Sequence, residues 1–311
     1  MGQKQKTVVT GGAGFIGSHI VDELIERGFD VAVIDNLIGG EKKHVNKKAI
    51  LHDVDIRNIE AIKPVIKSAQ YVFHVAALPR VQYSIENPNE TNDVNVNGTL
   101  NVLIASHEGG VEKVVYSASS AVYGDQPAST QDGGKTPLAE DMPVHPLSPY
   151  GLQKYVGELQ CKLWSKVYGL PTVSLRYFNV YGPRQNTEGA YALVIGKFLK
   201  QRGEGKPMTI TGDGEQTRDF IHVYDVVRAN MLAAESTNIS NGEVFNIGAG
   251  NNFSVNRIAE LIGGETTYIP TRLEPKHTLA DNTRARELLG WEPEITIEEG
   301  IAELKKLLHL A

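Results

Sequence analysis

The amino-acid sequence predicts an α/β protein with a doubly wound parallel sheet and a smaller C-terminal α/β lobe. Apolar runs typical of strands alternate with helical patterns through the first half of the 311 residues. Such alternation implies right-handed crossovers between parallel strands. A glycine-rich turn joins the first strand to the first helix, which is typical of Rossmann-type sheets. Beyond Gly182-Pro183 the alternation loosens, and there we expect the smaller lobe.

Hydrophobic periodicity predicts the individual elements. In the first half, strands are expected at residues 31–34, 49–52, 71–75, 113–117 and 172–176, and helices at 59–68, 90–107 and 150–168. In the second half, strands are expected at 208–211 and 267–269, and helices at 190–200, 256–261 and 297–308. The loop of residues 124–149 is long enough to frame a site.

The glycines near the N-terminus predict a dinucleotide site. They follow an apolar run with the spacing G-x-x-G-x-x-G, and a helical pattern that begins with Phe15 and Ile16 continues from them. Gly11 permits a tight turn, Gly14 lets a pyrophosphate approach the backbone, and Gly17 lets the helix pack close to the strand. The phosphates are then expected at the helix N-terminus, where unpaired N–H groups and the helix dipole favour anions.

The second strand bears on which dinucleotide binds. Its apolar run ends at Asp35. An acidic residue about 20 positions beyond the glycines binds the adenosine ribose hydroxyls and repels a 2′-phosphate, which favours NAD over NADP. Two alternatives stay open, namely that Asp35 only begins the following loop, or that Lys42 and Lys43 receive a phosphate.

Composition excludes several classes of partner. A net charge of −6 argues against a nucleic-acid or anionic-membrane surface. No stretch has the length of a membrane span, and the polar N-terminus lacks a signal-peptide core. The single cysteine, Cys161, rules out an internal disulfide, and its apolar helical face indicates a core position. We therefore expect a cytoplasmic protein with no nucleic-acid or membrane partner.

Five acidic and histidine residues could suggest a metal site or proton transfer, and we expect neither of them. His52, Asp53 and Asp55 follow a predicted strand, and we expect no metal there. His74 and His222 lie in apolar segments, where core packing is the expectation.

A serine, a tyrosine and a lysine form the candidate catalytic group. Tyr150 and Lys154 are four residues apart and lie on one helix face. Ser119 follows Ser117 at the C-terminal end of the strand predicted at residues 113–117. This end of the strands is the edge at which doubly wound sheets bind ligands. The combination is specific because all three side chains must converge on the nicotinamide.

These motifs resemble those of the extended short-chain dehydrogenase/reductase superfamily, and most closely its UDP-sugar 4-epimerases, which act on UDP-glucose or UDP-N-acetylglucosamine. The resemblance covers essentially the whole chain. The matching segments are residues 10–17, 55–57, 76–77, 97–99, 119–124, 150–154, 176–183 and 212–223.

The resemblance implies a reaction. Tyr150 takes the proton of the sugar C4 hydroxyl, hydride passes from C4 to NAD, and the 4-keto sugar receives it back on the other face. A free phenol has a pKa of about 10, and we expect the Lys154 ammonium and the nicotinamide to lower it. Ser119 is expected to hydrogen-bond the phenol oxygen. NAD stays bound through each cycle, and the resemblance also implies a homodimer.

The resemblance assigns further contacts and a domain division. NAD contacts are implied for Asn36, Asp55, Ile56, Ala76, Ala77, Leu78, Ser117, Tyr150, Lys154, Tyr177 and Phe178, in addition to the glycine turn and Asp35. UDP-sugar contacts are implied for Arg80, Ser119, Tyr150, Asn179, Val194, Arg218, Arg272, Glu274 and Thr278. The turn at Arg272–Glu274 lacks the glycine of relatives and is one residue shorter. Residues 1–177 form the NAD domain, with returning segments near 219–248, and residues 178–311 mainly form the nucleotide-sugar lobe.

Thr278 bears on substrate size. In the 4-epimerases this position lines the pocket near the sugar C2 substituent, and a small residue admits N-acetylated sugars. We therefore expect UDP-GlcNAc and UDP-GalNAc to be accepted beside UDP-glucose and UDP-galactose. The alternative is that Thr278 only caps a helix beginning near Asn282.

Individual residues bear on whether the protein has another activity of the superfamily. A 4,6-dehydratase carries an acid pair where this chain has Ser120-Ala121, which argues against dehydration. UDP-glucuronate 4-epimerisation or decarboxylation needs a partner for the sugar carboxylate, which Arg80 could supply. A non-catalytic NAD-binding protein is the remote alternative, since such proteins typically lose the tyrosine or the lysine.

Overall fold

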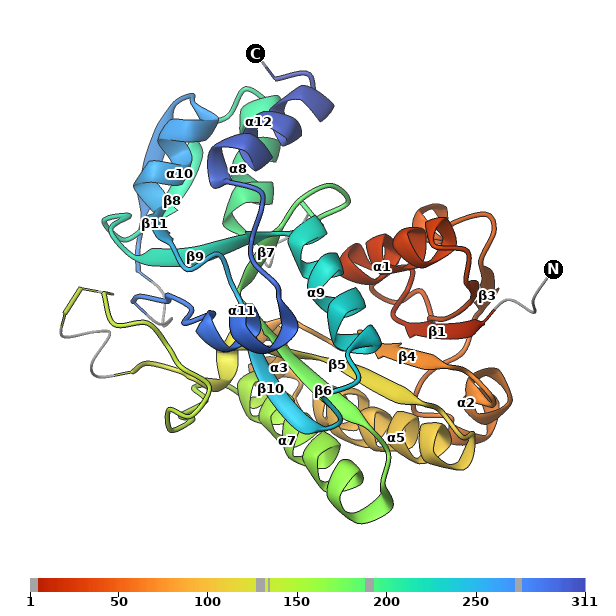
Figure 1. Cartoon of the computed structure of the whole chain (residues 1–311). Helices are drawn as coiled ribbons and strands as arrows, with labels where there is room; N and C mark the ends of the chain where they lie inside the picture. Colours follow the sequence, from red (N-terminus) through yellow and green to blue (C-terminus); the bar gives the residue numbers. More distant parts are fainter. Residues whose placement is uncertain (1–4, 127–131, 134, 188–192, 272–275, 311) are drawn as a thin grey trace.

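The centre of the structure is a parallel sheet with helices on both faces (Figure 1). The computed structural model describes residues 5–126, 132–133, 135–187, 193–271 and 276–310. Within these residues, seven strands form the main sheet in the order β10-β6-β5-β4-β1-β2-β3. Their bounds are β1 Lys6–Thr10, β2 Asp30–Ile34, β3 Ile50–His52, β4 Tyr71–His74, β5 Lys113–Ser119, β6 Thr172–Tyr177 and β10 Asn241–Ile247.

The strand order confirms the predicted doubly wound sheet. The chain builds from β1 outward to β3 and then returns to the other side of β1 with β4, β5 and β6. Every neighbouring pair in this sheet is parallel. The reversal falls between β1 and β4, and the crevice beyond the carboxyl ends of strands at such a point is where ligands bind in these folds.

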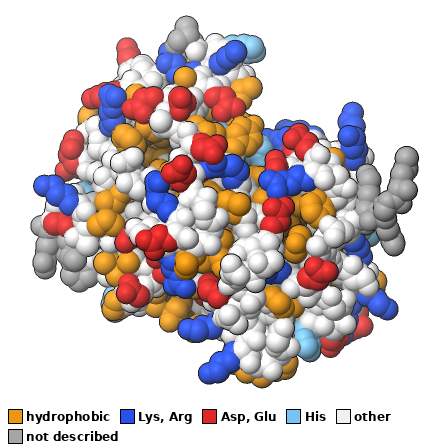
Figure 2. Space-filling view, viewed as in Figure 1, with side chains coloured by type: hydrophobic (Ala, Val, Ile, Leu, Met, Phe, Trp, Pro, Cys, Tyr) orange, Lys and Arg blue, Asp and Glu red, His pale blue; other side chains and the backbone are white. Residues whose placement is uncertain are grey.

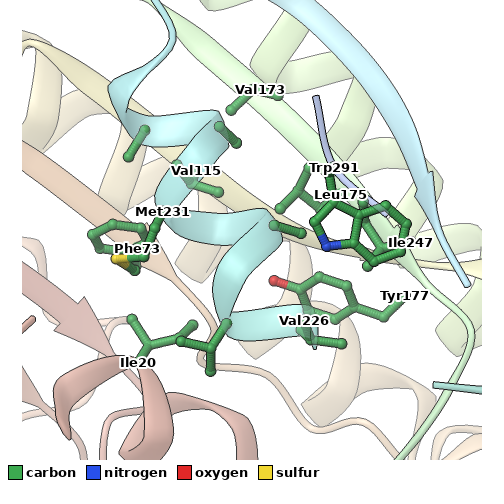
Figure 3. Packing of buried hydrophobic residues seen from close by; sticks show 14 of the residues in the cluster. Ile20, Phe73, Val115, Val173, Leu175, Tyr177, Val226, Met231, Ile247 and Trp291 are labelled. Carbon is green, nitrogen blue, oxygen red and sulfur yellow. The ribbon is translucent and has the colours of Figure 1, made fainter. Parts of the chain in front are cut away.

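Helices cover both faces because the strands are apolar on both sides. On one face lie α1 (Phe15–Glu26) and α9 (Val223–Glu235), which share a core with the strands. Figure 3 shows Met231 of α9 beside Phe73 of β4, and Val226 of the same helix beside Tyr177 of β6.

On the opposite face lie α2 (Ile59–Ile66), α5 (Thr99–Glu108) and α7 (Pro149–Leu163), which bury a second core. Successive strand residues such as Val114 and Val115 belong to different cores, as the alternation of a strand requires. The site is therefore carried by a sheet that is packed on both sides.

Two predicted helices contain π-helical turns. The helix expected at 90–107 consists of α4 (Pro88–Asn92), the π-helical η2 (Asp93–Gly98) and α5. The helix expected at 150–168 is α7 followed by the π-helical η4 (Trp164–Tyr168). Gly98 marks a close approach, because a Cβ there would lie 2.6 Å from the Ile56 side chain. Such turns are frequent at functional sites.

The smaller lobe has sheets of its own. Strand β9 (Thr217–His222) lies between β11 (Asn252–Ser254), which is antiparallel to it, and β7 (Asn179–Tyr181), which is parallel. A separate parallel pair consists of β8 (Met208–Thr211) and β12 (Thr266–Ile269). The predicted strand at 208–211 is confirmed residue for residue.

Three helices enclose the core of this lobe, namely α8 (Val194–Gly203), α10 (Val255–Ile262) and α12 (Ile297–Leu307). Residues 190–192 of the predicted helix 190–200 lie outside the described residues. After β12 the chain returns to the main sheet, where α11 (Thr283–Leu289) and Trp291 pack into its core. The division of the chain at residues 177 and 178 stays a prediction.

The remaining short elements are α3 (Val81–Glu86) and the 3₁₀ turns η1 (Lys42–His44) and η3 (Ser120–Val122). In the described part of the chain, no helix is both long and apolar enough to cross a bilayer. Acidic and basic side chains are interspersed over the face seen in Figure 2.

A buried ion pair fastens α7 to the sheet. The guanidinium of Arg176 in β6 donates to both carboxylate oxygens of Glu158 in α7, at 2.9 and 2.8 Å. The two side chains are only 4% and 3% exposed. Arg176 also donates to the Tyr123 hydroxyl at 2.8 Å, and that hydroxyl donates to Asn246 of β10 at 2.7 Å. The pair thus joins α7, two strands and the segment after β5.

We expect Glu158→Gln to lower the free energy of unfolding by about 3–5 kcal/mol, because it leaves a buried guanidinium without its counter-charge. Denaturant titration measures the change. Glu60→Gln is the control, since Glu60 contacts Lys63 at 3.4 Å but is 81% exposed, and it should change stability little. Equal losses in the two variants would contradict this account of the pair.

Candidate active site

The glycine turn leaves open space at the start of α1. A Cβ at Gly17 would lie 2.2 Å from the Gly11 carbonyl oxygen, so this close approach requires glycine. A Cβ at Gly14 would meet only that same oxygen, at 3.2 Å, and would otherwise project into the space in front of the turn. Among the described residues, no side chain caps this helix, and its first turn holds no acid. The turn therefore fits a pyrophosphate.

Asp35 lies beside this turn at the end of β2. Its carboxylate accepts from the backbone N–H of Ala13 at 2.9 Å and of Leu37 at 2.8 Å, and the residue is 8% exposed. The bond to Leu37 N–H agrees with the alternative that Asp35 begins the loop after β2. It does not exclude a ribose, because each carboxylate oxygen has a second acceptor site. Lys43, offered as a phosphate partner, pairs with Glu41 at 2.6 Å.

A second carboxylate stands next to Asp35 along the sheet edge. Asn36 donates to Asp55 at 2.8 Å, and the Arg57 guanidinium donates to it at 2.8 and 3.0 Å. These bonds, led by that of Arg57, lower the pKa of Asp55 to about 2. Ile56 is buried against Gly98. Asn36, Asp55 and Ile56, for which NAD contacts are predicted, therefore lie close together beside Asp35.

The backbone after β4 is fixed by side chains from beneath. The Thr10 hydroxyl accepts from Ala76 N–H at 3.2 Å, and the Asn95 amide both accepts from Leu78 N–H at 2.8 Å and donates to its carbonyl at 3.2 Å. Asn95 also donates to Gln153 of α7 at 2.8 Å. The segment Ala76, Ala77 and Leu78 is thus tied to the helix that carries Tyr150. Sequence reasoning missed Asn95 and Gln153, although both lie within or beside the quoted motifs.

His74 supports the same edge from within the core. It is 1% exposed and contacts the hydroxyls of Thr10 at 2.7 Å and Thr99 at 3.0 Å. Burial lowers the pKa of His74 to about 3. The predicted core position of His74 is confirmed, and so is that of His222, which is fully buried.

The N-terminus of α7 presents Tyr150 to the end of β5. The Ser148 side chain caps the helix by accepting from Gly151 N–H at 3.1 Å, and Pro149 is the first helical residue. Tyr150 follows and is 8% exposed, and its side chain interacts with that of Ser119 at the end of β5, which lowers the pKa of the phenol in part. The structure therefore brings these two predicted catalytic groups together.

Lys154 lies one helical turn further on and is 3% exposed. Its ammonium donates to the Ser117 carbonyl at 2.7 Å and lies 4.9 Å from the centroid of the Tyr116 ring. Burial lowers the pKa of Lys154 to about 8. The ammonium is thus held against the main chain of β5, two residues before Ser119.

In the protein alone the pKa of Tyr150 is raised, and its lowering by Lys154 together with the nicotinamide stays a prediction. Burial raises the pKa of Tyr150, and the hydrogen bond with Ser119 opposes this only in part. The Lys154 ammonium is held by the Ser117 carbonyl, and loss of hydration outweighs any effect of its charge on the phenol.

Three predicted cofactor residues contribute side chains to the core below the site. The Ser117 hydroxyl lies 3.1 Å from the Tyr177 hydroxyl, which donates to Asn230 of α9 at 3.0 Å. Phe178 is 2% exposed and packs beside the ring of Tyr123, with centroids 6.2 Å apart. These side chains support the floor of the site.

On the side of the smaller lobe, three predicted substrate residues gather around β9. Asn179 donates to the Asp219 carbonyl at 3.1 Å and lies 3.5 Å from the Thr278 hydroxyl. Arg218 is 9% exposed and donates to the carbonyls of Thr217 and Lys276 at 2.9 and 3.1 Å.

The capping interpretation of Thr278 is wrong. Helix α11 is preceded by Asn282, and the Thr278 hydroxyl instead accepts from Asp219 N–H at 3.4 Å. Of the other predicted substrate residues, Arg80 precedes α3 and is exposed, Val194 opens α8, and Arg272 and Glu274 lie outside the described residues.

Comparisons with known proteins agree with this geometry. The model of the NAD dependent epimerase/dehydratase family matches residues 7–248. A UDP-glucose 4-epimerase of Mycolicibacterium smegmatis is 37% identical in an alignment that is 317 positions long, gaps included, and covers 96% of each chain. The crystal structure of UDP-glucose 4-epimerase with UDP-glucose from Thermotoga maritima is 39% identical, with a TM-score of 0.90 and coverage of 98% of this chain and 100% of that one.

A third relative carries a different sugar. The UDP-N-acetylglucosamine 4-epimerase of Methanobrevibacter ruminantium, in complex with UDP-N-acetylmuramic acid, is 38% identical, with a TM-score of 0.90 and coverage of 98% of both chains. The match of the family model alone spans more than half of this chain. The protein therefore belongs to the NAD dependent epimerase/dehydratase family and is an NAD-dependent enzyme.

Proposed function

We propose that the protein inverts C4 of a UDP-hexose through a 4-keto sugar and so interconverts UDP-glucose and UDP-galactose. The observation that carries the proposal is the placement of buried Tyr150 and Lys154 of α7 at the end of β5, where Ser119 lies, on the sheet edge that also holds the glycine turn. The three relatives described above, all 4-epimerases of UDP-sugars, support the same substrate class.

In this proposal, Tyr150 exchanges the proton of the C4 hydroxyl as general acid and base. Ser119 orients the phenol by hydrogen bonding. When bound, NAD would supply the hydride chemistry at C4 of the sugar. With a pKa of about 8, Lys154 is mostly an ammonium at neutral pH. Two of its N–H donors remain for the nicotinamide ribose after the bond to Ser117.

We infer that the other end of the cofactor follows the carboxylates described above. Gly11, Gly14 and Gly17 and the N–H groups of the first turn of α1 would hold the pyrophosphate. The ribose hydroxyls bind Asp35, whose negative charge disfavours a 2′-phosphate and so selects NAD over NADP.

We further propose a homodimer, supported by an apolar stripe on α7 and η4. Leu152, Leu159, Leu163 and Val167 are 51%, 48%, 49% and 60% exposed, at spacings that keep them on one side of the helix. A twofold axis lets such a stripe bury itself against its own copy. Sedimentation equilibrium should give twice the 34.0 kDa of one chain, and a single-chain mass would contradict the dimer.

We expect Tyr150→Phe to lower turnover of UDP-glucose by roughly 10²–10⁴-fold, because it removes the proton-transferring group. Chromatography of UDP-glucose and UDP-galactose measures the reaction, and NAD content is checked on the purified variant. Tyr155→Phe, a change on the same helix without a proposed role, should retain wild-type turnover. If Tyr150→Phe turns over UDP-glucose normally while retaining NAD, the assignment of Tyr150 is wrong.

The size of the residue at position 278 should set which sugars are accepted. We expect wild-type protein to convert UDP-GlcNAc as well as UDP-glucose, because Thr278 is small. Thr278→Tyr fills that volume and should suppress UDP-GlcNAc turnover while sparing UDP-glucose. Equal loss of both sugars would contradict the pocket argument. UDP-glucuronate is assayed as a third substrate. Conversion of UDP-glucuronate alone would favour the alternative activity, in which Arg80 contacts the sugar carboxylate.

A further inference from the structure

Asp219 in β9 is a fully buried carboxylate outside the catalytic group, and its side-chain partners among the described residues are backbone N–H groups. Its Oδ1 accepts from Ala249 N–H at 2.7 Å, and its Oδ2 accepts from Gly250 N–H at 3.0 Å and Ala280 N–H at 2.9 Å. One side chain therefore holds the chain after β10, at the edge of the main sheet, together with a segment that follows β12.

The main chain of the same residue contacts two residues proposed for the sugar site. Asp219 N–H donates to the Thr278 hydroxyl at 3.4 Å, and the Asp219 carbonyl accepts from the Asn179 amide at 3.1 Å. Arg218 is its neighbour in the chain. The position of Asp219 thus sets the positions of all three.

The carboxylate also completes a row of bonds along β9. Thr217 N–H donates to the Lys276 carbonyl and Thr278 N–H donates to the Thr217 carbonyl, each at 3.1 Å. At the next bonding position, Ala280 N–H reaches the Asp219 carboxylate instead of a main-chain carbonyl. Residues 276–280 therefore run alongside β9 like a further strand, and Asp219 fixes the end of that run.

Three donors on two oxygens require an ionised carboxylate. An asparagine amide would place an N–H group against one or two of the backbone N–H groups and leave them buried without acceptors. There is little room to adjust, because a Cβ at Gly248 would lie 2.5 Å from the Ala280 side chain and 3.1 Å from Oδ2. Burial raises the pKa of Asp219 to about 7, so assays belong above that pH.

Asp225 in α9 offers a matched comparison. It is 1% exposed and accepts from the backbone N–H groups of Glu294 at 3.0 Å and Ile295 at 3.2 Å, and from Arg228 at 3.0 Å. It therefore anchors a later segment of the chain, outside the group formed by Asn179, Arg218 and Thr278.

We propose that Asp219 is a positioning residue that holds Thr278, Asn179 and Arg218 in register to receive the UDP-sugar. The inference rests on the proposed function for the identity of that ligand. It predicts that a change at Asp219 weakens substrate binding, whereas proton transfer at Tyr150, on the other side of the site, continues once the sugar is bound.

The test compares Asp219→Asn with Asp225→Asn at about pH 8. Steady-state kinetics give KM and kcat for UDP-glucose, calorimetry gives the Kd of UDP, and thermal unfolding gives Tm. We expect Asp219→Asn to raise KM and the Kd of UDP by about tenfold or more, with kcat changed much less. Asp225→Asn should lower Tm and leave KM and the Kd of UDP unchanged.

Unchanged KM and Kd in Asp219→Asn, or an equal rise in Asp225→Asn, would overturn the inference. If the wild type ignores UDP-glucose but binds UDP, the proposed reaction fails, and the Kd of UDP still decides the role of Asp219. If Asp219→Asn does not fold, the role of Asp219 is tested by hydrogen exchange of the wild-type protein with and without UDP-glucose. UDP-glucose should slow exchange in residues 248–250 and 276–282, and no change there would overturn the inference.

Discussion

The candidate site depends on the parallel alignment of β1, β4, β5 and β6, because parallel strands end at the same edge of a sheet. That edge receives the glycine turn from β1, the segment of Ala76 from β4 and Ser119 from β5. Tyr150 reaches it from α7, which the buried pair of Arg176 and Glu158 ties to β6. Contacts that look structural, such as this pair, therefore fix where the chemistry takes place.

The strands of the main sheet could be predicted because burial on both faces makes each of them a continuous apolar run. Helix α9 was not predicted as a helix, and its burial explains why. Polar Asp225 and Asn230 are buried in it together with apolar residues. Its less buried side carries hydrophobic Tyr224 and Leu232 beside Arg228 and Glu235, so side-chain polarity does not mark the helical period. The π turn η2 was also missed, since its residue Asn95 is set by contacts to Leu78 and Gln153, which are distant in the sequence.

In the site, too, features set by local spacing could be predicted, and features set by contacts distant in the sequence could not. Tyr150, Lys154 and the glycines could be identified because their spacing is local, and Ser119 because it ends a strand. The role of Asp219 could not, since its carboxylate meets residues 30 and 61 positions away. The pKa of Tyr150 could not be predicted from spacing either, because the burial that raises it depends on tertiary packing. In the proposed function, the general acid–base groups lie on the edge of the main sheet and the residues that position the ligand lie around β9.

The central claim is that a hydrogen leaves C4 of a UDP-hexose and returns to the same carbon within one closed site. Incubating the purified protein with UDP-glucose deuterated at C4, without added NAD, tests it most directly. The account predicts UDP-galactose that retains the deuterium at C4, as seen by mass spectrometry and NMR. Loss of the deuterium to water during conversion, or an absence of conversion by protein that contains NAD, would contradict it.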